Sequence, residues 1–202
     1  MTSITERIHQ NFVYPRRIDV LSRQLASQLP PNGRVLDVGC GDGEISQAIL
    51  RARPDLHIEG IEVLLRGTPH IRVSQYDGLN IPFPGNSFDA VMFVDVLHHT
   101  NDPSQLLREA ARVASQRVVI KDHTADGLLA FKTLRFLDDV GNARHGVALP
   151  YNYWKEAQWR SELQKAGLEV SAWNAHLHLY PWPASLFFDR SLHFIAALAL
   201  RG

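Results

Sequence analysis

Arg34-Val-Leu-Asp-Val-Gly-Cys-Gly-Asp-Gly43 carries the most informative pattern in this chain. Residues 34–38 form a short β-branched run, which is typical of a buried strand. Residues 39–43 place a glycine at every second position, which allows a tight turn. The stretch from Glu44 to Arg53 has the character of a helix and is closed by Pro54. The sequence therefore predicts a strand, a glycine loop and a helix in direct succession.

The same order of strand and helix continues on both sides of this segment. Upstream, Pro15 to Leu29 predicts a helix that Pro30-Pro-Asn-Gly33 stops. Downstream, the pattern predicts strands at 57–61, 70–74, 88–94, 117–121, 168–173 and 192–199, helices after Asp102-Pro103, at 127–137 and at 152–166, and an irregular stretch at 141–150. This alternation predicts an α/β fold with an open, mostly parallel sheet, right-handed crossovers and helices on both faces.

The composition describes one soluble domain of 202 residues without an electrostatic bias. Lys plus Arg and Asp plus Glu both number 21, so the formal net charge is zero, and the basic residues are scattered along the chain. Nucleic-acid scaffolds carry a basic face, which this sequence lacks. We therefore expect no nucleic-acid partner.

The cysteine content and the two ends of the chain favour a cytoplasmic protein. Cys40 is the one cysteine, so no internal disulfide can form. Residues 1–10 hold charged side chains where a signal peptide would hold an apolar core. The apolar run 194–200 is too short to span about 30 Å of hydrocarbon. We expect neither secretion nor a membrane span.

The spacing of the glycine loop argues against a dinucleotide. A dinucleotide loop requires G-x-G-x-x-G, whereas position 44, where the third glycine would stand, is a glutamate. A carboxylate at a helix N-terminus would repel a pyrophosphate. Asp37 and Asp42 add negative charge around the loop, which favours a ligand with a cationic or zwitterionic group.

At this point the chain resembles the class I S-adenosylmethionine-dependent methyltransferases, from Val35 to Asp122. Residues 35–43 are close to the first motif of that family. The resemblance implies a Rossmann-like three-layer sandwich with a seven-stranded sheet, an antiparallel last strand, and S-adenosylmethionine as cofactor. It also implies that the loop approaches the methionine part of the cofactor, with Asp37 near its amino group and with backbone contacts from Gly39, Cys40, Gly41 and Gly43.

Two further segments match the resemblance. Glu62 ends the second predicted strand, nineteen residues past Gly43, and corresponds to the family's ribose-binding acid. One carboxylate can accept hydrogen bonds from both ribose hydroxyls, and Glu59 is the competing candidate. Asp77, Gly78 and Leu79 follow the third strand and resemble the adenine-binding segment, although Asp-Gly is also a common turn dipeptide.

The fourth predicted strand ends in Asp95-Val-Leu-His-His-Thr100, which resembles the branch that contains quinone and sterol methyltransferases. The segment differs from the Asn/Asp-Pro-Pro-Tyr/Phe motif of enzymes that methylate nucleic-acid amines. The resemblance places Asp95 at the cofactor and implies a small-molecule, apolar or lipid-like acceptor. DNA adenine methylation is disfavoured.

Methyl transfer requires alignment of a nucleophile and, where the nucleophile carries a proton, a base of near-neutral pKa. His98, His99 and His123 follow the fourth and fifth strands, and we predict His98 and His123 as catalytic, with a purely structural role as the alternative.

Two pairs of residues are candidate metal ligands. His176 and His178 share one face of a predicted strand, and Asp95 and Asp122 end adjacent strands. Neither pair completes a ligand set, so we predict no metal site.

The predicted organisation is one domain with three parts: a helical cap at 1–33 with Tyr14, Arg16 and Arg17, the cofactor core at 34–122, and an acceptor side at 123–202. Residues 141–146 are a candidate lid. The aromatic stretch 179–188, with Trp182 and Phe187, is a candidate acceptor wall, a homodimer patch or plain packing. Two other functions stay open, a catalytically silent cofactor-binding subunit and a nicotinamide-dependent oxidoreductase.

Overall fold

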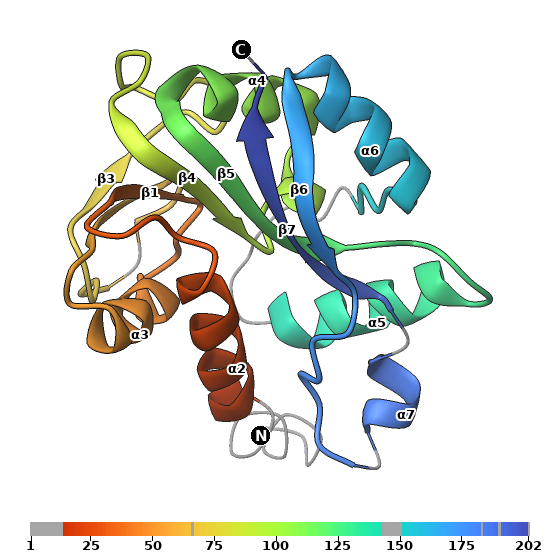
Figure 1. Ribbon diagram of the computed structural model, residues 1–202. Coiled ribbons are helices and arrows are strands. Elements are labelled where there is room, and N and C mark those ends of the chain that lie inside the picture. The colour runs from red at the N-terminus through yellow and green to blue at the C-terminus, as the bar shows by residue number, and fades with distance from the viewer. Residues whose placement is uncertain (1–13, 66, 143–150, 183, 190, 202) are drawn as a thin grey trace.

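The computed structural model describes residues 14–65, 67–142, 151–182, 184–189 and 191–201 (Figure 1). The helices are α2 (Tyr14–Ala26), α3 (Glu44–Ala52), the 3-10 turn η2 (Leu97–His99), α4 (Pro103–Val113), α5 (Ala130–Asn142), α6 (Glu156–Lys165) and α7 (Ser185–Phe188). The strands are β1 (Arg34–Val38), β2 (His57–Glu62), β3 (Val73–Gln75), β4 (Phe88–Val94), β5 (Ala114–His123), β6 (Leu168–Asn174) and β7 (His193–Leu200).

One sheet of seven strands, in the order β3-β2-β1-β4-β5-β7-β6, confirms the predicted fold class. Strands β1 to β5 pair in parallel, and β7 lies antiparallel between β5 and β6. The carboxyl ends of β1, β2, β4 and β5 consequently meet at one edge of the sheet. Ligands of open parallel sheets bind at that edge.

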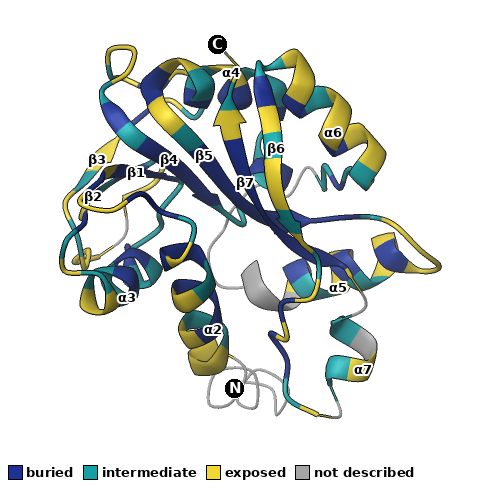
Figure 2. Cartoon of the chain, in the orientation of Figure 1, coloured by how far each residue is buried: buried dark blue, intermediate teal, exposed yellow. Residues whose placement is uncertain are grey.

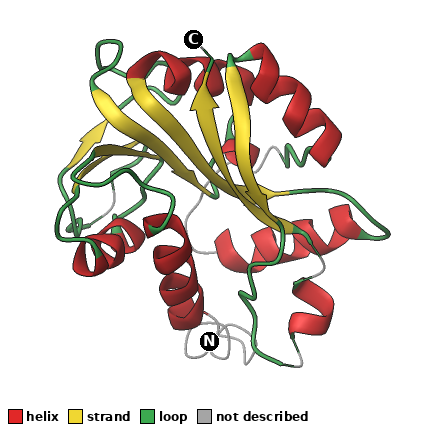
Figure 3. Cartoon of the chain, in the orientation of Figure 1, coloured by secondary structure: helices red, strands yellow, loops and turns green. Residues whose placement is uncertain are grey.

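Helices cover the sheet on both faces (Figure 3). Alternate residues of β4 divide between two cores: Val91 and Phe93 pack with α4 and α6, whereas Ala90 and Met92 pack with α2 and α3. The buried strands lie between these helix layers in Figure 2. A central parallel strand covered on both sides explains why residues 88–94 are apolar almost throughout.

Several boundaries differ from the predicted ones. Strand β5 is longer, 114–123 against 117–121, because it pairs with β7 as far as His123 opposite His193. Strand β3 is shorter, 73–75 against 70–74, because it is an edge strand that pairs with three residues of β2. The amino-terminal helix ends at Ala26 and not at Leu29.

The two helices that were predicted for the carboxyl-terminal half, α5 and α6, also begin later than predicted. Helix α5 covers 130–142 and not 127–137, because Gly127 and Leu129 both have positive φ. Helix α6 begins at Glu156 and not at 152, because Asn152 bonds outward, from its N–H to the carbonyl of His98 and from Nδ2 to the carbonyl of Thr100. These bonds attach residue 152 to the chain that leaves β4.

Part of the predicted cap and lid lies outside the described residues, namely 1–13 and 143–150, and so does the side chain of Phe187. Gly141 and Asn142 of the predicted lid form the last residues of α5. No helix among the described residues has both the length and the hydropathy needed to cross a membrane.

Candidate functional site

The glycine loop lies at the carboxyl end of β1 and leads into α3. Gly39, Gly41 and Gly43 all have positive φ, at 72°, 61° and 79°. A Cβ on Gly39 would lie 2.7 Å from Cγ1 of Val96, and one on Gly43 would lie 2.5 Å from Cγ1 of Ile71. A Cβ on Gly41 would meet no atom of the protein within 4 Å. Gly39 and Gly43 are thus required by packing, whereas Gly41 faces open space.

Cys40 fills a gap between β1 and β2. A Cβ on Gly60 of β2 would lie 2.3 Å from Sγ of Cys40, so the glycine at 60 makes room for the thiol. Burial raises the pKa of this thiol, which keeps it protonated and unreactive. The side chain of Cys40 is therefore a packing element, and its predicted backbone contact to a cofactor stays a prediction.

Asp37 lies beneath the loop and is 3% exposed. Its Oδ2 accepts a 2.6 Å hydrogen bond from Oγ of Ser46, and its buried Oδ1 has no partner in the described part of the chain. Burial raises the pKa of Asp37 to about 7, against the opposing effect of Ser46. An unpartnered buried carboxylate oxygen stabilises a cationic group placed beside it, so this residue fits the ammonium group of S-adenosylmethionine.

Glu62 ends β2 and holds the glycine loop. Its Oε2 accepts from the N–H of Gly41 at 2.7 Å, and its Oε1 accepts from the N–H of Val63 at 2.8 Å. The carboxylate is therefore fixed directly beside the open space at Gly41. The position agrees with the predicted ribose contact, which stays a prediction.

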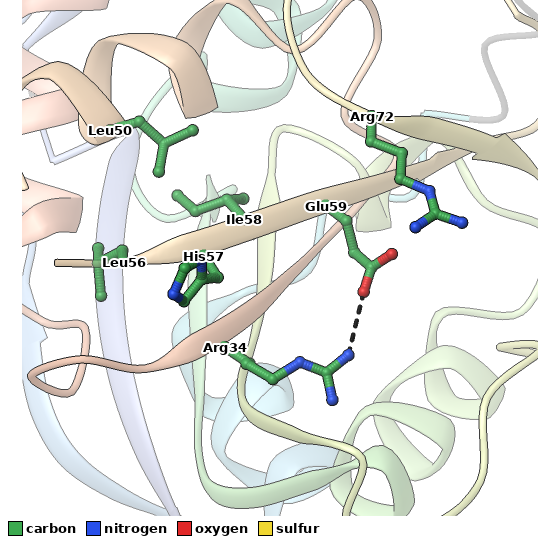
Figure 4. A pocket seen from close by; sticks show the side chains of 7 residues that line it. All are labelled: Arg34, Leu50, Leu56, His57, Ile58, Glu59 and Arg72. Atoms are coloured by element: carbon green, nitrogen blue, oxygen red, sulfur yellow. Dashed lines mark hydrogen bonds and ion pairs between the residues drawn. The ribbon is translucent and has the colours of Figure 1, made fainter. Parts of the chain in front are cut away.

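The competing carboxylate, Glu59, lies elsewhere. It forms an ion pair with Arg34 (Figure 4). Both side chains line a hollow of about 370 Å³, together with Leu50, Leu56, His57, Ile58 and Arg72. Arg34 and His57 begin β1 and β2, at the opposite end of these strands from the glycine loop. Glu62, and not Glu59, is therefore the carboxylate at the loop.

Asp77, Gly78 and Leu79 form a turn after β3. Oδ1 of Asp77 accepts from the N–H groups of Leu79 and Asn80 at 2.8 and 2.7 Å, and hydrogen bonds from Asn80 lower the pKa of Asp77. Gly78 has a φ of 84°, and Leu79 is 41% exposed. Asp77 thus stabilises a turn, and Leu79 offers an exposed apolar edge beside it. The adenine contacts of Asp77, Gly78 and Leu79 stay a prediction.

Asp95, the first residue after β4, joins three parts of the molecule. It accepts from the guanidinium of Arg17 in α2 at 2.6 Å and from Nζ of Lys121 in β5, and Nε2 of His123 lies 3.7 Å away. Burial alone would raise the pKa of Asp95, but the charges of Lys121 and Arg17 outweigh it and hold that pKa well below its usual range. Asp95 is therefore an ionised anchor beside the loop.

The structure brings the two predicted catalytic histidines together. Nδ1 of His98 lies 3.4 Å from Nδ1 of His123, and both side chains are almost fully buried. Nδ1 of His98 also lies 2.6 Å from Asp122, and its Nε2 lies 3.5 Å from Asp138. Burial alone would lower the pKa of His98, but the two carboxylates raise it to about 10. A raised pKa favours the charged imidazolium of His98, which suits a general base less well than a neutral imidazole, and its predicted catalytic role stays a prediction.

His123 has the opposite electrostatic environment. Burial, together with the positive charges of Lys121 and His98, lowers its pKa below the usual value. His123 is consequently neutral near pH 7 and is able to accept a proton.

Sequence reasoning missed three members of this buried polar network: Lys121 of β5, which is fully buried, Asp138 of α5 and His193 of β7. Asp122 of β5, also fully buried, was considered only as a possible metal ligand. The hydroxyl of Tyr153 donates to Asp138. The charged pair Lys121-Asp122 at the end of an apolar strand was the one available signal. The position of Asp138 depends on how α5 returns to the sheet.

Two groups in the described chain have donor atoms within 4.8 Å of one another and could ligate a metal: Asp95, His98 and His123, and His98, His99 and Asp138. Asp95 already pairs with two protein cations, and His98 pairs with Asp122. Because protein cations neutralise these carboxylates, we propose no metal here.

The chain is similar to methyltransferases in sequence and in fold. A family model described as a methyltransferase domain matches residues 8–172. The chain is 32% identical over 108 residues to the 27-O-demethylrifamycin SV methyltransferase of Amycolatopsis mediterranei, over 46% of this chain and 39% of that protein. It is 31% identical over 117 residues to the ubiquinone biosynthesis O-methyltransferase of Hahella chejuensis, over 50% of this chain and 46% of that protein. The chain thus spans less than half the length of these two curated relatives.

A solved structure shows the same fold. The S-adenosylmethionine-dependent methyltransferase of Aquifex aeolicus superimposes with a TM-score of 0.63 at 17% identity, over 96% of this chain and 98% of that one.

Proposed function

Because the chain belongs to the methyltransferase domain family, we propose that it transfers a methyl group from S-adenosylmethionine to a small or lipid-like organic acceptor. The observation that carries the proposal is the loop after β1. There a Cβ on Gly41 would meet no protein atom within 4 Å, and the carboxylate of Glu62 accepts from the N–H of the same glycine. In the preceding strand β1, Oδ1 of Asp37 has no partner among the described residues. That arrangement fits a ligand with vicinal hydroxyls and an ammonium group.

The cofactor supplies an electrophilic methyl group on a sulfonium. Asp37 holds the ammonium group, Glu62 accepts from the ribose hydroxyls, and the turn 77–79 supports the adenine. Asp95 stays ionised at the end of β4 and orients Lys121 and Arg17 around the site. These residues align the cofactor, which is the main requirement of a displacement at carbon.

His123 is the base in this proposal. It is neutral near pH 7 and is able to remove the proton of an acceptor hydroxyl or acidic carbon, while the adjacent imidazolium of His98 is a fixed positive charge. The side chain lies at the end of β5, beside the end of β4. Both strand ends belong to the ligand edge of the sheet.

The names of the relatives support a small-molecule acceptor. One is named for a rifamycin and another for ubiquinone biosynthesis. The zero formal charge of the chain gives no electrostatic reason to expect a nucleic acid. We further propose that residues 1–33 form a cap, 34–122 the cofactor core and 123–202 the acceptor side of one domain.

Calorimetry with S-adenosylhomocysteine and with NAD tests the cofactor. We expect binding of the first and no binding of the second. Release of S-adenosylhomocysteine during incubation with S-adenosylmethionine and a panel of phenols, hydroquinones and macrolide alcohols then tests the reaction. Cofactor binding without turnover of any acceptor class would favour a silent cofactor-binding subunit.

Replacing Glu62 by alanine is expected to weaken binding of S-adenosylhomocysteine by about 10- to 150-fold. The paired contact to the two ribose hydroxyls is lost, at about 1.5–3 kcal/mol in total, and the N–H of Gly41 loses its partner. Glu59→Ala removes a carboxylate three residues away on the same strand and is the matched control. Unchanged affinity in Glu62→Ala, or an equal loss in Glu59→Ala, would contradict the ribose assignment.

A further inference from the structure

We infer that Arg17, which forms an ion pair with Asp95, binds the carboxylate of the methionine part of the cofactor. The inference rests on the proposed function and assigns a residue of α2 to the binding site.

The charges around the glycine loop leave the carboxylate of the ligand without a partner. The methionine part of S-adenosylmethionine carries an ammonium and a carboxylate. The loop and its neighbours contribute four acidic side chains: Asp37, Asp42, Glu44 and Glu62. These suit the ammonium group and repel the carboxylate. A cation must therefore approach the loop from another element.

Helix α2 brings such a cation to the loop. The hydroxyl of Tyr14 donates to Glu44 at the start of α3 at 2.8 Å, and Arg17, one turn later, bonds to Asp95 at 2.6 Å. Val96, the neighbour of Asp95, lies against Gly39. The guanidinium of Arg17 is therefore bonded to the residue next to the one that packs on Gly39, while the start of the same helix is bonded to the residue that follows Gly43. Figure 1 shows α2 beside α3 at this edge of the sheet.

Of the two basic side chains that donate to Asp95 in the described chain, Arg17 is the one that is free to change partner. Lys121 is fully buried, and its Nζ lies 3.4 Å from Nδ1 of His193. The side chain of Arg17 is 24% exposed and offers a planar fork that matches a carboxylate. If Arg17 turns to the ligand, Asp95 keeps Lys121, so no buried charge is left unpaired.

The test compares two ligands that differ in the amino-acid part. S-adenosylhomocysteine carries the carboxylate, whereas 5′-methylthioadenosine has the same nucleoside without it. We expect Arg17→Met to weaken binding of S-adenosylhomocysteine by about tenfold or more and to leave binding of 5′-methylthioadenosine unchanged. Arg16→Met is the matched control, because Arg16 bonds to the carbonyl of His178 and should affect neither ligand.

A second measurement reports on the helix itself. We expect S-adenosylhomocysteine to slow amide hydrogen exchange in α2 of the wild-type protein, and 5′-methylthioadenosine to leave it unchanged. Arg17→Lys serves if the methionine variant does not fold. It keeps the positive charge but loses the planar guanidinium, so we expect a smaller loss of affinity that is still confined to S-adenosylhomocysteine.

Two results would overturn the inference alone, provided that the wild type binds both ligands. An equal loss of both ligands in Arg17→Met would give Arg17 a purely structural role. Unchanged binding of S-adenosylhomocysteine in that variant would remove the contact altogether. If instead the wild type binds neither ligand, the proposed function fails and the inference fails with it.

Discussion

Replacing Gly41 by valine should abolish measurable binding of S-adenosylhomocysteine in a protein that still folds. A Cβ at position 41 meets no protein atom within 4 Å, so the substitution creates no internal clash. The branched side chain projects into the open space beside Glu62, where the proposed cofactor lies. A β-branched residue at a φ of 61° adds backbone strain of about 1–3 kcal/mol, which lowers stability but leaves most domains folded. Calorimetry and a thermal melt separate the two effects.

Gly167, at the end of α6, provides the matched control. It also has a positive φ, 76°, and a Cβ there also meets nothing within 4 Å. Gly167→Val should therefore lose similar stability and retain full affinity for S-adenosylhomocysteine. Gly39→Val and Gly43→Val are less informative because they would clash with Val96 and Ile71. Retained binding in folded Gly41→Val would show that the open space does not hold the ligand.

The residues around the loop could be predicted because their signals are local. The β-branched run, the alternating glycines and Glu62 belong to consecutive elements of the chain. Because β1 and β2 pair in parallel, Glu62 comes to lie beside Gly41. The apolar run 88–94 likewise revealed a central strand with two covered faces. In these places the local pattern and the tertiary contacts agree.

The remainder of the site depends on long-range contacts that no local pattern records. Arg17 reaches Asp95 across 78 positions, and Asp138 meets His98 only because α5 folds back over the end of β4. The protonation of His98 was therefore hidden, since it follows from two carboxylates on other elements. The start of α6 was missed for the same reason, because Asn152 bonds to the chain after β4.

Replacing His123 by glutamine should lower turnover by about 100-fold or more while affinity for S-adenosylhomocysteine stays nearly unchanged. Glutamine has a similar length and can still hydrogen-bond, but it cannot accept a proton. His123 qualifies as the base because burial and the charges of Lys121 and His98 lower its pKa. Steady-state rates with the identified acceptor, beside calorimetry of the cofactor, measure the two effects separately.

The pH dependence of turnover distinguishes a base from a residue that only supports the fold. The pKa of His123 lies below its ordinary value of about 6.5, so the imidazole is neutral at pH 7 and gains a proton as the pH falls. The measurement is made at saturating S-adenosylmethionine, because its ammonium group favours the ionised form of Asp37, whose pKa is about 7 without that partner. Under these conditions the wild-type rate should be level from about pH 7 to 8 and decline only below about pH 6.5. The residual rate of His123→Gln should lack that acid decline, because no proton is gained at position 123. His98, with its pKa of about 10, stays charged across this range and cannot produce the decline. A variant that keeps both the full rate and the acid decline would show that the acceptor reaches the methyl group already ionised.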